Sequence, residues 1–195
     1  MAQANAVVDV VYPLDVFQSQ PDLPELYVRG DTHWNAHGAV LFYRLVMDAI
    51  GVEAMPGDRL RIVGKMEKGD LSWKLGHLTY YERPRIIHPD FDCTFNNAVA
   101  NVGHRIDYVH RRKDLPSCLL FRDSFSTIQL PLYAQSFSRL WAVWQPNIDY
   151  GLVQELQPDF VISQQVERML VHCPDDIAGK TNAEYAAAKR AGVHR

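Results

Sequence analysis

Residues 118–163 form the most regular part of this 195-residue chain, with the sequence CLLFRDSFSTIQLPLYAQSFSRLWAVWQPNIDYGLVQELQPDFVIS. Three compact apolar runs within it predict buried strands: Cys118–Phe121, Arg139–Val143 and Asp159–Ser163. The segments between them are typical of short helices: Leu130–Ser136 and Tyr150–Leu156. Strands that alternate with helices predict an α/β domain with a mostly parallel sheet.

The part before this stretch is organised around one amphipathic helix. Phe42, Leu45, Val46 and Ala49 follow the i, i+3, i+4, i+7 spacing of an apolar helix face, and Gly51 is a suitable stop. Further apolar runs predict strands: Ala6–Val11, Leu60–Val63, Arg85–Ile87, Ala98–Val102 and Ile106–Val109. We therefore expect one domain over residues 1–182, with an irregular insertion at about 55–115 and a charged, alanine-rich tail at 183–195.

The composition excludes several classes of protein. Hydrophobic residues make up 47% of the chain and charged residues 22%, the balance of a protein that builds its own core. The formal net charge of −3 argues against a dedicated nucleic-acid-binding protein. Three cysteines without paired spacing cannot form a closed disulfide framework. The longest apolar stretch, residues 38–52, is interrupted by Arg44 and Asp48, so the sequence predicts no membrane span.

Two short segments concentrate residues that can do chemistry, and the first is Asp31-Thr32-His33-Trp34-Asn35. Side chains two apart on an extended segment project to the same side, so Asp31 and His33 are expected to meet. A carboxylate placed in this way holds the imidazole in one tautomer and stabilises its protonated form. His33 is therefore a candidate general base.

The second segment is Asp123-Ser124-Phe125, which comes directly after a predicted strand and before a predicted helix. Ligands of open α/β sheets bind at the carboxyl ends of the strands, where Ser124 would lie. A serine hydroxyl needs an adjacent base before it can act as a nucleophile. His33, already coupled to a carboxylate by its spacing, is the candidate for that base.

Other interpretations of the same residues stay open. Asp31, Asn35 or Ser124 could each be a simple helix cap. Asp31, His33 and His37 have a spacing compatible with metal ligands, which would make the protein a metal-dependent hydrolase. A third hypothesis is an inactive carbohydrate-binding or scaffolding domain with tryptophans for stacking on sugars: Trp34, Trp73 and Trp144.

Residues 27–39, YVRGDTHWNAHGA, resemble the D-x-H-W signature of the SGNH-hydrolase-like proteins related to alginate O-acetyltransferases. Residues 121–126, FRDSFS, are similar to the serine block of that family, and Gly69-Asp70-Leu71 matches a short G-D-L element between the two. The order Asp, His, Ser is that of this family, and the closing residues 158–168 resemble its final strand. The resemblance covers about residues 26–170.

The resemblance implies an SGNH-like, flavodoxin-like fold and a catalytic triad. In it, Ser124 is the nucleophile, His33 the base and Asp31 the carboxylate that orients it. The implied reaction passes an acetyl group through an acetyl-serine to a polysaccharide hydroxyl or to water, as an O-acetyltransferase or acetylesterase. We expect substrate-binding residues beside the triad: Trp34, Asn35 and Arg122. This route needs no cofactor and no metal.

The sequence departs from the family pattern in two places near the predicted site. Arg122 stands where a typical serine block of this family has glycine. The G-x-N-D block that supplies an oxyanion asparagine elsewhere has no match, so Asn96, Asn97 or the backbone would have to serve.

The resemblance also implies partners and a location. It implies a polysaccharide acceptor, an acetyl donor and a membrane-bound acetyl-transfer partner, in the periplasm or otherwise outside the cytoplasm. Family members usually carry an N-terminal signal or anchor, whereas about 25 residues precede the D-x-H-W block here. We therefore expect either a trimmed chain or a shortened relative.

Overall fold

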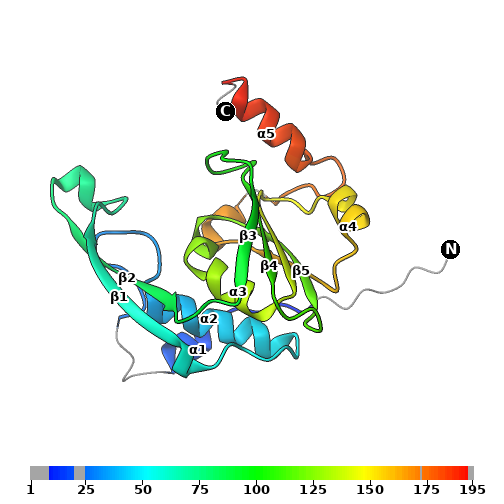
Figure 1. The fold of residues 1–195 in the computed structure, drawn as a ribbon. Helices are drawn as coiled ribbons and strands as arrows, with labels where there is room; N and C mark the ends of the chain where they lie inside the picture. Colours follow the sequence, from blue (N-terminus) through cyan, green and yellow to red (C-terminus); the bar gives the residue numbers. More distant parts are fainter. Residues whose placement is uncertain (1–8, 20–24, 172, 193–195) are drawn as a thin grey trace.

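The computed structural model describes residues 9–19, 25–171 and 173–192. Its centre is a five-stranded sheet with the strand order β3-β4-β6-β5-β7 (Figure 1). The strands of this sheet are β3 (Phe91–Asn96), β4 (Arg105–His110), β5 (Ser117–Arg122), β6 (Arg139–Trp144) and β7 (Phe160–Gln164). Strands β6, β5 and β7 run parallel, whereas β4 and β3 are antiparallel to their neighbours, so the sheet is mixed. The expected α/β class is confirmed.

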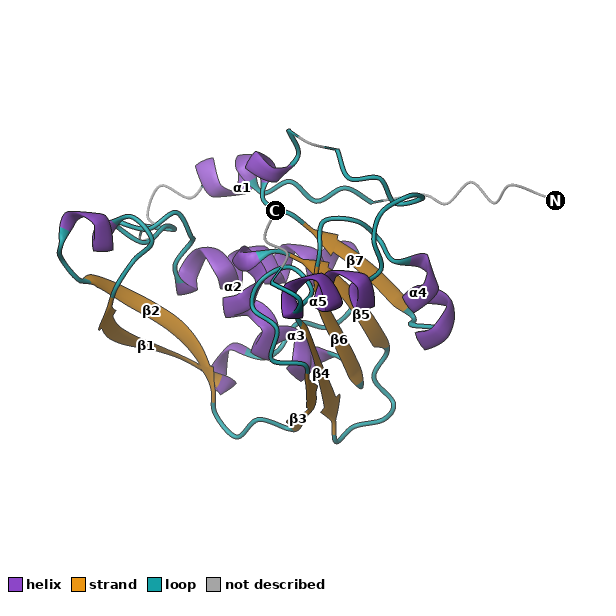
Figure 2. Ribbon diagram, turned by 90° about the horizontal axis from the view of Figure 1, so that it is seen from above, coloured by secondary structure: helices purple, strands orange, loops and turns teal. Residues whose placement is uncertain are grey.

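Helices cover both faces of the sheet (Figure 2). Side chains along a strand point alternately to the two faces. Cys118 and Leu120 of β5 pack in the larger core with α2 (Ala36–Ala49) and α3 (Leu130–Ser136). Leu119 and Phe121 point the other way, into a smaller cluster with α4 (Tyr150–Leu156). Burial on both faces explains why residues 118–121 of β5 are all apolar.

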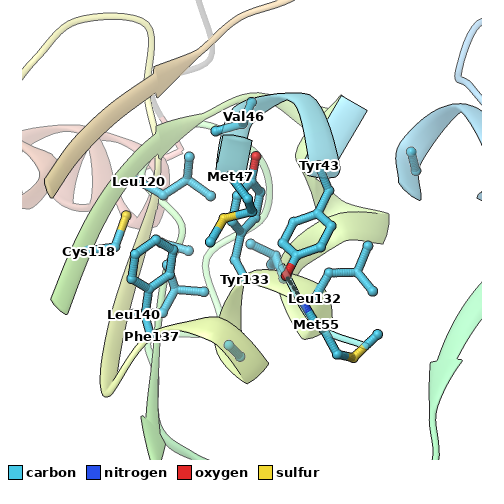
Figure 3. Close-up of a cluster of buried hydrophobic side chains, with 14 of the residues drawn as sticks. Tyr43, Val46, Met47, Met55, Cys118, Leu120, Leu132, Tyr133, Phe137 and Leu140 are labelled. Carbon is cyan, nitrogen blue, oxygen red and sulfur yellow. Dashed lines mark hydrogen bonds between the residues drawn. The ribbon is translucent and has the colours of Figure 1, made fainter. Parts of the chain in front are cut away.

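The larger core contains aromatic side chains and methionines as well as aliphatic residues. Tyr43 and Met47 of α2 lie against Tyr133 of α3 and Leu120 of the sheet (Figure 3). The Tyr43 hydroxyl lies at hydrogen-bond distance from Ser136 Oγ and accepts a hydrogen bond from the Met55 amide at 2.8 Å. The buried phenol is thereby satisfied, as burial of a polar group requires.

Strands β1 (Leu60–Glu67) and β2 (Thr79–Ile86) form a separate two-stranded antiparallel hairpin. The hairpin reaches away from the five-stranded sheet, on the side where α2 begins (Figures 1 and 2). The expected insertion at about 55–115 thus contains two different parts. Residues 60–86 build this hairpin, while β3 and β4 extend the main sheet.

The remaining elements are short. They are α1 (Leu14–Gln18), α5 (Asn182–Arg190) and the 3-10 helices η1 (Gly57–Arg59), η2 (Ser72–Leu75), η3 (Ser124–Gln129) and η4 (Glu167–Met169). Helix α5 contains most of the expected charged tail, and a capping box between Thr181 and Glu184 starts it. No helix in the described ranges is long and apolar enough to cross a membrane.

Most predicted elements between residues 36 and 164 are confirmed, and one predicted strand, Ala98–Val102, is wrong. Residues 98–102 form a turn, because Ala98 and Asn101 adopt positive φ angles of 56° and 59° and asparagine side chains accept the amides of Ala98 and Val99. The predicted strand Ala6–Val11 lies partly outside the described residues, and residues 9–11 pair with no described strand. Strand β2 overlaps the predicted Arg85–Ile87 run but begins earlier, at Thr79.

Candidate active site

The Asp31–His33 segment is a tight turn rather than the extended segment expected from the sequence. Gly30 turns the chain with a φ of +78°, and the His33 amide donates to Asp31 Oδ1 at 2.8 Å. This is the local turn that an aspartate makes with the residue two positions on. The two side chains still meet, because the turn brings the imidazole over the carboxylate that it folds around.

Ser124 lies at the carboxyl end of β5, as predicted. Strand β5 ends at Arg122, and Ser124 is the first residue of the 3-10 helix η3. Asp123 is the N-cap: Oδ1 accepts from the Phe125 amide at 2.8 Å, and Oδ2 accepts from the Val166 amide at 2.6 Å. Ser124 is therefore not the cap itself, and its hydroxyl is left for other contacts.

The two segments converge across 91 residues of sequence. His33 Nδ1 lies 2.6 Å from Asp31 Oδ1, and His33 Nε2 lies 2.8 Å from Ser124 Oγ. The imidazole packs on the Phe125 ring, with 4.9 Å between the ring centroids. Asp31, His33 and Ser124, called the triad below, thus have the connectivity of a nucleophile, its base and the group that orients the base.

The Asp31 carboxylate accepts four hydrogen bonds. Two come from His33, one from the Asp70 amide at 2.7 Å, and one from the hydroxyl of Tyr81 in β2. Burial acts to raise the pKa of Asp31, but the hydrogen bonds from Tyr81, Asp70 and His33 outweigh it and hold the pKa below its usual value. Asp31 therefore stays an anion that can stabilise a protonated His33.

The Gly69–Leu71 loop is fixed against the Asp31 turn. The Ser72 amide donates to the Gly30 carbonyl at 2.8 Å, and Asp70 Oδ1 accepts from the Thr32 amide at 2.8 Å. A Cβ atom on Gly69 would lie 2.6 Å from the Gly30 carbonyl oxygen, so the approach requires glycine. The resemblance alone indicated this loop, whereas nothing in the sequence indicated Tyr81, which lies 50 residues after Asp31.

Trp34 and Asn35, expected to bind substrate, take structural positions beside the triad. The Trp34 indole donates to the Phe125 carbonyl at 2.8 Å, and its ring is 7% exposed. Asn35 caps α2 by accepting from the amides of His37 and Gly38. Trp34 still lines the cavity in front of Ser124, so a contact between this ring and a substrate stays a prediction.

Arg122, also expected to bind substrate, lies behind Ser124 and is 1% exposed. Its guanidinium lies 4.4 Å from the centre of the Trp144 ring and donates to the Asp123 carbonyl and to Thr127 Oγ1. Burial lowers the pKa of Arg122 to about 10, while the Asp123 carboxylate acts in the opposite direction. The residue remains a cation at neutral pH, and a direct contact with substrate stays a prediction.

The triad opens into a cavity of about 460 Å³. The β1–β2 hairpin and its connecting loop contribute Lys68, Tyr81 and Arg83 to the lining, and helix η3 contributes Ser124, Phe125, Thr127 and Ile128. Trp144 lines the same cavity. The position of the Trp73 side chain lies outside the described part. A cavity with charged and aromatic walls beside the Ser124 hydroxyl is a suitable place for a polar ligand.

The expected metal-ligand set is wrong in one member. His37 belongs to helix α2 and faces Glu82 at 3.6 Å, whereas His33 lies in the turn before the helix, so the two do not share a helix face. Among the described residues, the group of three possible metal ligands whose donor atoms all lie within 4.8 Å of one another is Asp31, His33 and Asp70. The hydrogen bonds given above already engage Asp31 and His33.

The side chains of Asn96 and Asn97 do not reach the cavity. Asn97 donates to the Gly103 carbonyl, and Asn96 Oδ1 accepts from the Ala98 amide, so both serve the turn between β3 and β4. The Phe125 amide is also engaged, by the Asp123 side chain. Neither expected asparagine is thus an oxyanion donor.

Comparisons with solved structures find this fold in other proteins. A DHHW family protein from Eubacterium siraeum matches with a TM-score of 0.59 at 11% identity, over 72% of this chain and 58% of its own. Bacillus cereus PatB1 with a sulfonyl adduct matches with a TM-score of 0.60 at 16% identity, over 80% of this chain and 65% of its own. The chain therefore spans less than two thirds of either protein. These likenesses establish a shared fold.

The O-acetyltransferase domain of Pseudomonas putida AlgJ matches with a TM-score of 0.42 at 15% identity, over 92% of this chain and 65% of its own. That likeness is too weak to indicate a shared fold. No family model matches the sequence, and no curated protein matches it.

Proposed function

We propose that this protein is a serine-dependent O-acetyltransferase or acetylesterase that acts on a polysaccharide. The observation that carries the proposal is the continuous line of contacts from Asp31 Oδ1 through His33 to Ser124 Oγ. Both distances lie within hydrogen-bond reach, the geometry that a general base and its nucleophile require. That the transferred group is acetyl and that the acceptor is a polysaccharide is inferred from the sequence resemblance.

The reaction follows from the roles of the three side chains. Ser124 Oγ attacks the acetyl carbonyl while His33 Nε2 takes the hydroxyl proton, and the resulting imidazolium is stabilised by Asp31. The tetrahedral intermediate breaks its bond to the donor oxygen, which leaves with the proton from His33. A sugar hydroxyl or water then loses its proton to His33 and attacks the acetyl-serine. The bond from the acetyl carbon to Ser124 Oγ breaks, and His33 returns the proton to Ser124 Oγ, which restores the starting state.

The partners and location belong to the proposal as well. The acceptor is a polysaccharide hydroxyl, and the acetyl donor is delivered by a membrane-bound partner outside the cytoplasm. The charged side chains that line the cavity, Lys68 and the Arg83–Glu67 ion pair, support a polar acceptor, because such groups form hydrogen bonds with the hydroxyl groups of a sugar.

The test is the effect of Ser124→Ala on acetate release from p-nitrophenyl acetate and on transfer to an oligosaccharide. We expect a loss on the order of 10⁴-fold or more in kcat, as for removal of a triad nucleophile. The matched control is Ser126→Ala. Ser126 lies in the same 3-10 helix, is fully buried, and its Oγ has no partner within the described ranges. The control should retain activity, whereas an unchanged rate in Ser124→Ala would overturn the proposal.

A chelator provides the second arm of the test. Asp31 and His33 already use their polar atoms for the contacts of the triad. We therefore expect turnover of p-nitrophenyl acetate to persist after dialysis against EDTA. Loss of activity that added Zn²⁺ restores would favour the metal-dependent hydrolase instead.

A further inference from the structure

A relay of hydrogen bonds links the turn between β3 and β4 to the cavity wall beside Ser124. His104 Nε2 lies 3.1 Å from Asn96 Oδ1, and His104 Nδ1 lies 2.9 Å from Arg122 Nη2. Arg122 Nη1 in turn lies 3.0 Å from Thr127 Oγ1. We call these four residues the Asn96–Thr127 relay. Thr127 is its end at the cavity, and the relay is separate from the triad.

The chemistry of arginine fixes the direction of every bond in the relay. A guanidinium donates and never accepts, so His104 Nδ1 must be an acceptor, and its Nε2–H donates to Asn96. Thr127 Oγ1 likewise accepts from Arg122. The Thr127 hydroxyl hydrogen is thus left to be donated, and no acceptor for it lies within hydrogen-bond distance in the part of the chain that the structure describes.

The 3-10 geometry of η3 places Thr127 above Ser124. Residues i and i+3 of a 3-10 helix are eclipsed and lie one turn, about 6 Å, apart. Both residues line the cavity, and Thr127 is exposed to it. An acyl group on Ser124 extends into this gap, and a hydrogen bond of about 2.9 Å between its oxygen and the Thr127 hydroxyl covers the remaining distance.

Arg122 adds a positive charge behind the Thr127 hydroxyl. The guanidinium is buried and forms no ion pair within 4 Å among the described residues, although the Asp123 carboxylate acts on it over a longer distance. Burial and the nearby Arg122 lower the pKa of His104, so His104 stays neutral and adds no second charge. A buried cation without a paired carboxylate suits a place where negative charge develops during a reaction, because the charge is then stabilised at low local dielectric.

We propose that the Thr127 hydroxyl donates a hydrogen bond to the oxyanion that forms when Ser124 attacks an ester carbonyl. Arg122 is a positioning residue that orients and polarises this hydroxyl. The inference rests on the proposed function, and it fills the place that the Asn96 and Asn97 side chains do not take.

The test compares Thr127→Val, which keeps the shape and removes the hydroxyl, with Thr127→Ser, which keeps the hydroxyl. Acylation of Ser124 by p-nitrophenyl acetate is followed as the pre-steady-state burst. We expect Thr127→Val to slow acylation about 10²-fold, as for loss of one oxyanion donor, with KM nearly unchanged. Thr127→Ser should recover most of the rate. Thr127→Val also removes the acceptor of the buried Arg122 Nη1, so it should lower the thermal unfolding temperature modestly, whereas Thr127→Ser keeps the acceptor and should not.

Arg122→Lys separates positioning from a purely structural role. If Arg122 acts through Thr127, the single substitution Arg122→Lys slows acylation. The same substitution made in the Thr127→Val variant then causes no further loss of acylation rate. An equal loss in both backgrounds would overturn the role assigned to Arg122.

The two proposals fail in different ways. A wild-type acylation rate in Thr127→Val, or an equally slow Thr127→Ser, overturns the oxyanion role while acylation of Ser124 stands. A wild-type protein that forms no acyl-Ser124 overturns both proposals.

Discussion

At the scale of single residues, the site depends on how the Asp31 carboxylate is held. One oxygen binds His33, and the other accepts from the Asp70 amide and the Tyr81 hydroxyl. Desolvation and the hydrogen bond to Asp31 raise the pKa of Tyr81, so the phenol remains a donor at any physiological pH. In the proposed mechanism, Tyr81 therefore acts through Asp31, whose carboxylate it helps to keep ionised.

Tyr81→Phe tests this indirect role. The change removes one hydrogen bond to the carboxylate and leaves the ring in place. We expect a loss of about 1 kcal/mol, which corresponds to about a fivefold fall in kcat. The pKa of Asp31 should rise, which NMR titration of its carboxyl carbon can measure. A variant with unchanged kcat and unchanged Asp31 pKa would contradict the role assigned to Tyr81.

At the scale of elements, three separate segments build the site. The turn before α2 supplies Asp31 and His33, the start of η3 supplies Ser124, and the β1–β2 hairpin with its Gly69–Leu71 loop supplies the support. Asp123 fixes the second of these, because it accepts from amides on both η3 and the segment after β7. The placement of Ser124 thus depends on one buried carboxylate.

Asp123→Ala should therefore cost both stability and activity. Loss of the cap and of the Val166 contact should lower the free energy of unfolding by about 2 kcal/mol, and the shift of Ser124 should lower kcat/KM. The matched control is Asp149→Ala, because Asp149 caps α4 and accepts from the amides of Leu152 and Asn182. Urea unfolding should show similar losses for the two variants. Equal losses of activity would contradict the specific role of Asp123.

At the scale of the whole molecule, two histidines make stability depend on pH, the partly buried His104 and the buried His110. Burial lowers the pKa of His104, with Arg122 acting in the same direction, and burial also lowers that of His110, although Asp90 opposes it. A histidine in the unfolded chain has a pKa of about 6.5. Below that pH the unfolded chain binds more protons than the folded one, so stability falls as the pH falls. The lowered pKa of Asp31 adds a further loss below about pH 4.

Urea unfolding at pH 8, 7, 6 and 5 measures this dependence. We expect a nearly constant free energy of unfolding from pH 8 to 7 and a progressive decrease from pH 6 to 5. A free energy that is flat or rises toward pH 5 would show that neither histidine is buried in its neutral form.

Local patterns in the sequence predicted the elements whose structure depends on burial. They failed where contacts between residues far apart in the sequence determine the conformation or the site. Strand β5 and helix α3 were predicted with bounds close to those observed, because both are continuously buried. The turn at Ala98 was predicted as a strand, since its apolar residues have the same composition as a strand. Sequence spacing paired Asp31 with His33, but contacts from Tyr81 and Thr127 come from tertiary structure, which no local pattern contains.

Formation of an acyl-enzyme on Ser124 is the most direct test of the proposed chemistry. The protein is mixed with p-nitrophenyl acetate, quenched in acid within the burst, digested and analysed by mass spectrometry. A sulfonyl fluoride serves as a second, irreversible probe, because a serine hydroxyl activated by an adjacent base attacks the sulfonyl group and displaces fluoride. We expect p-nitrophenyl acetate to leave one acetyl group on Ser124 and the sulfonyl fluoride, in a separate sample, to leave one sulfonyl group there. Neither adduct should form in Ser124→Ala. Turnover without any adduct on Ser124, or an adduct that persists in Ser124→Ala, would contradict Ser124 as the nucleophile.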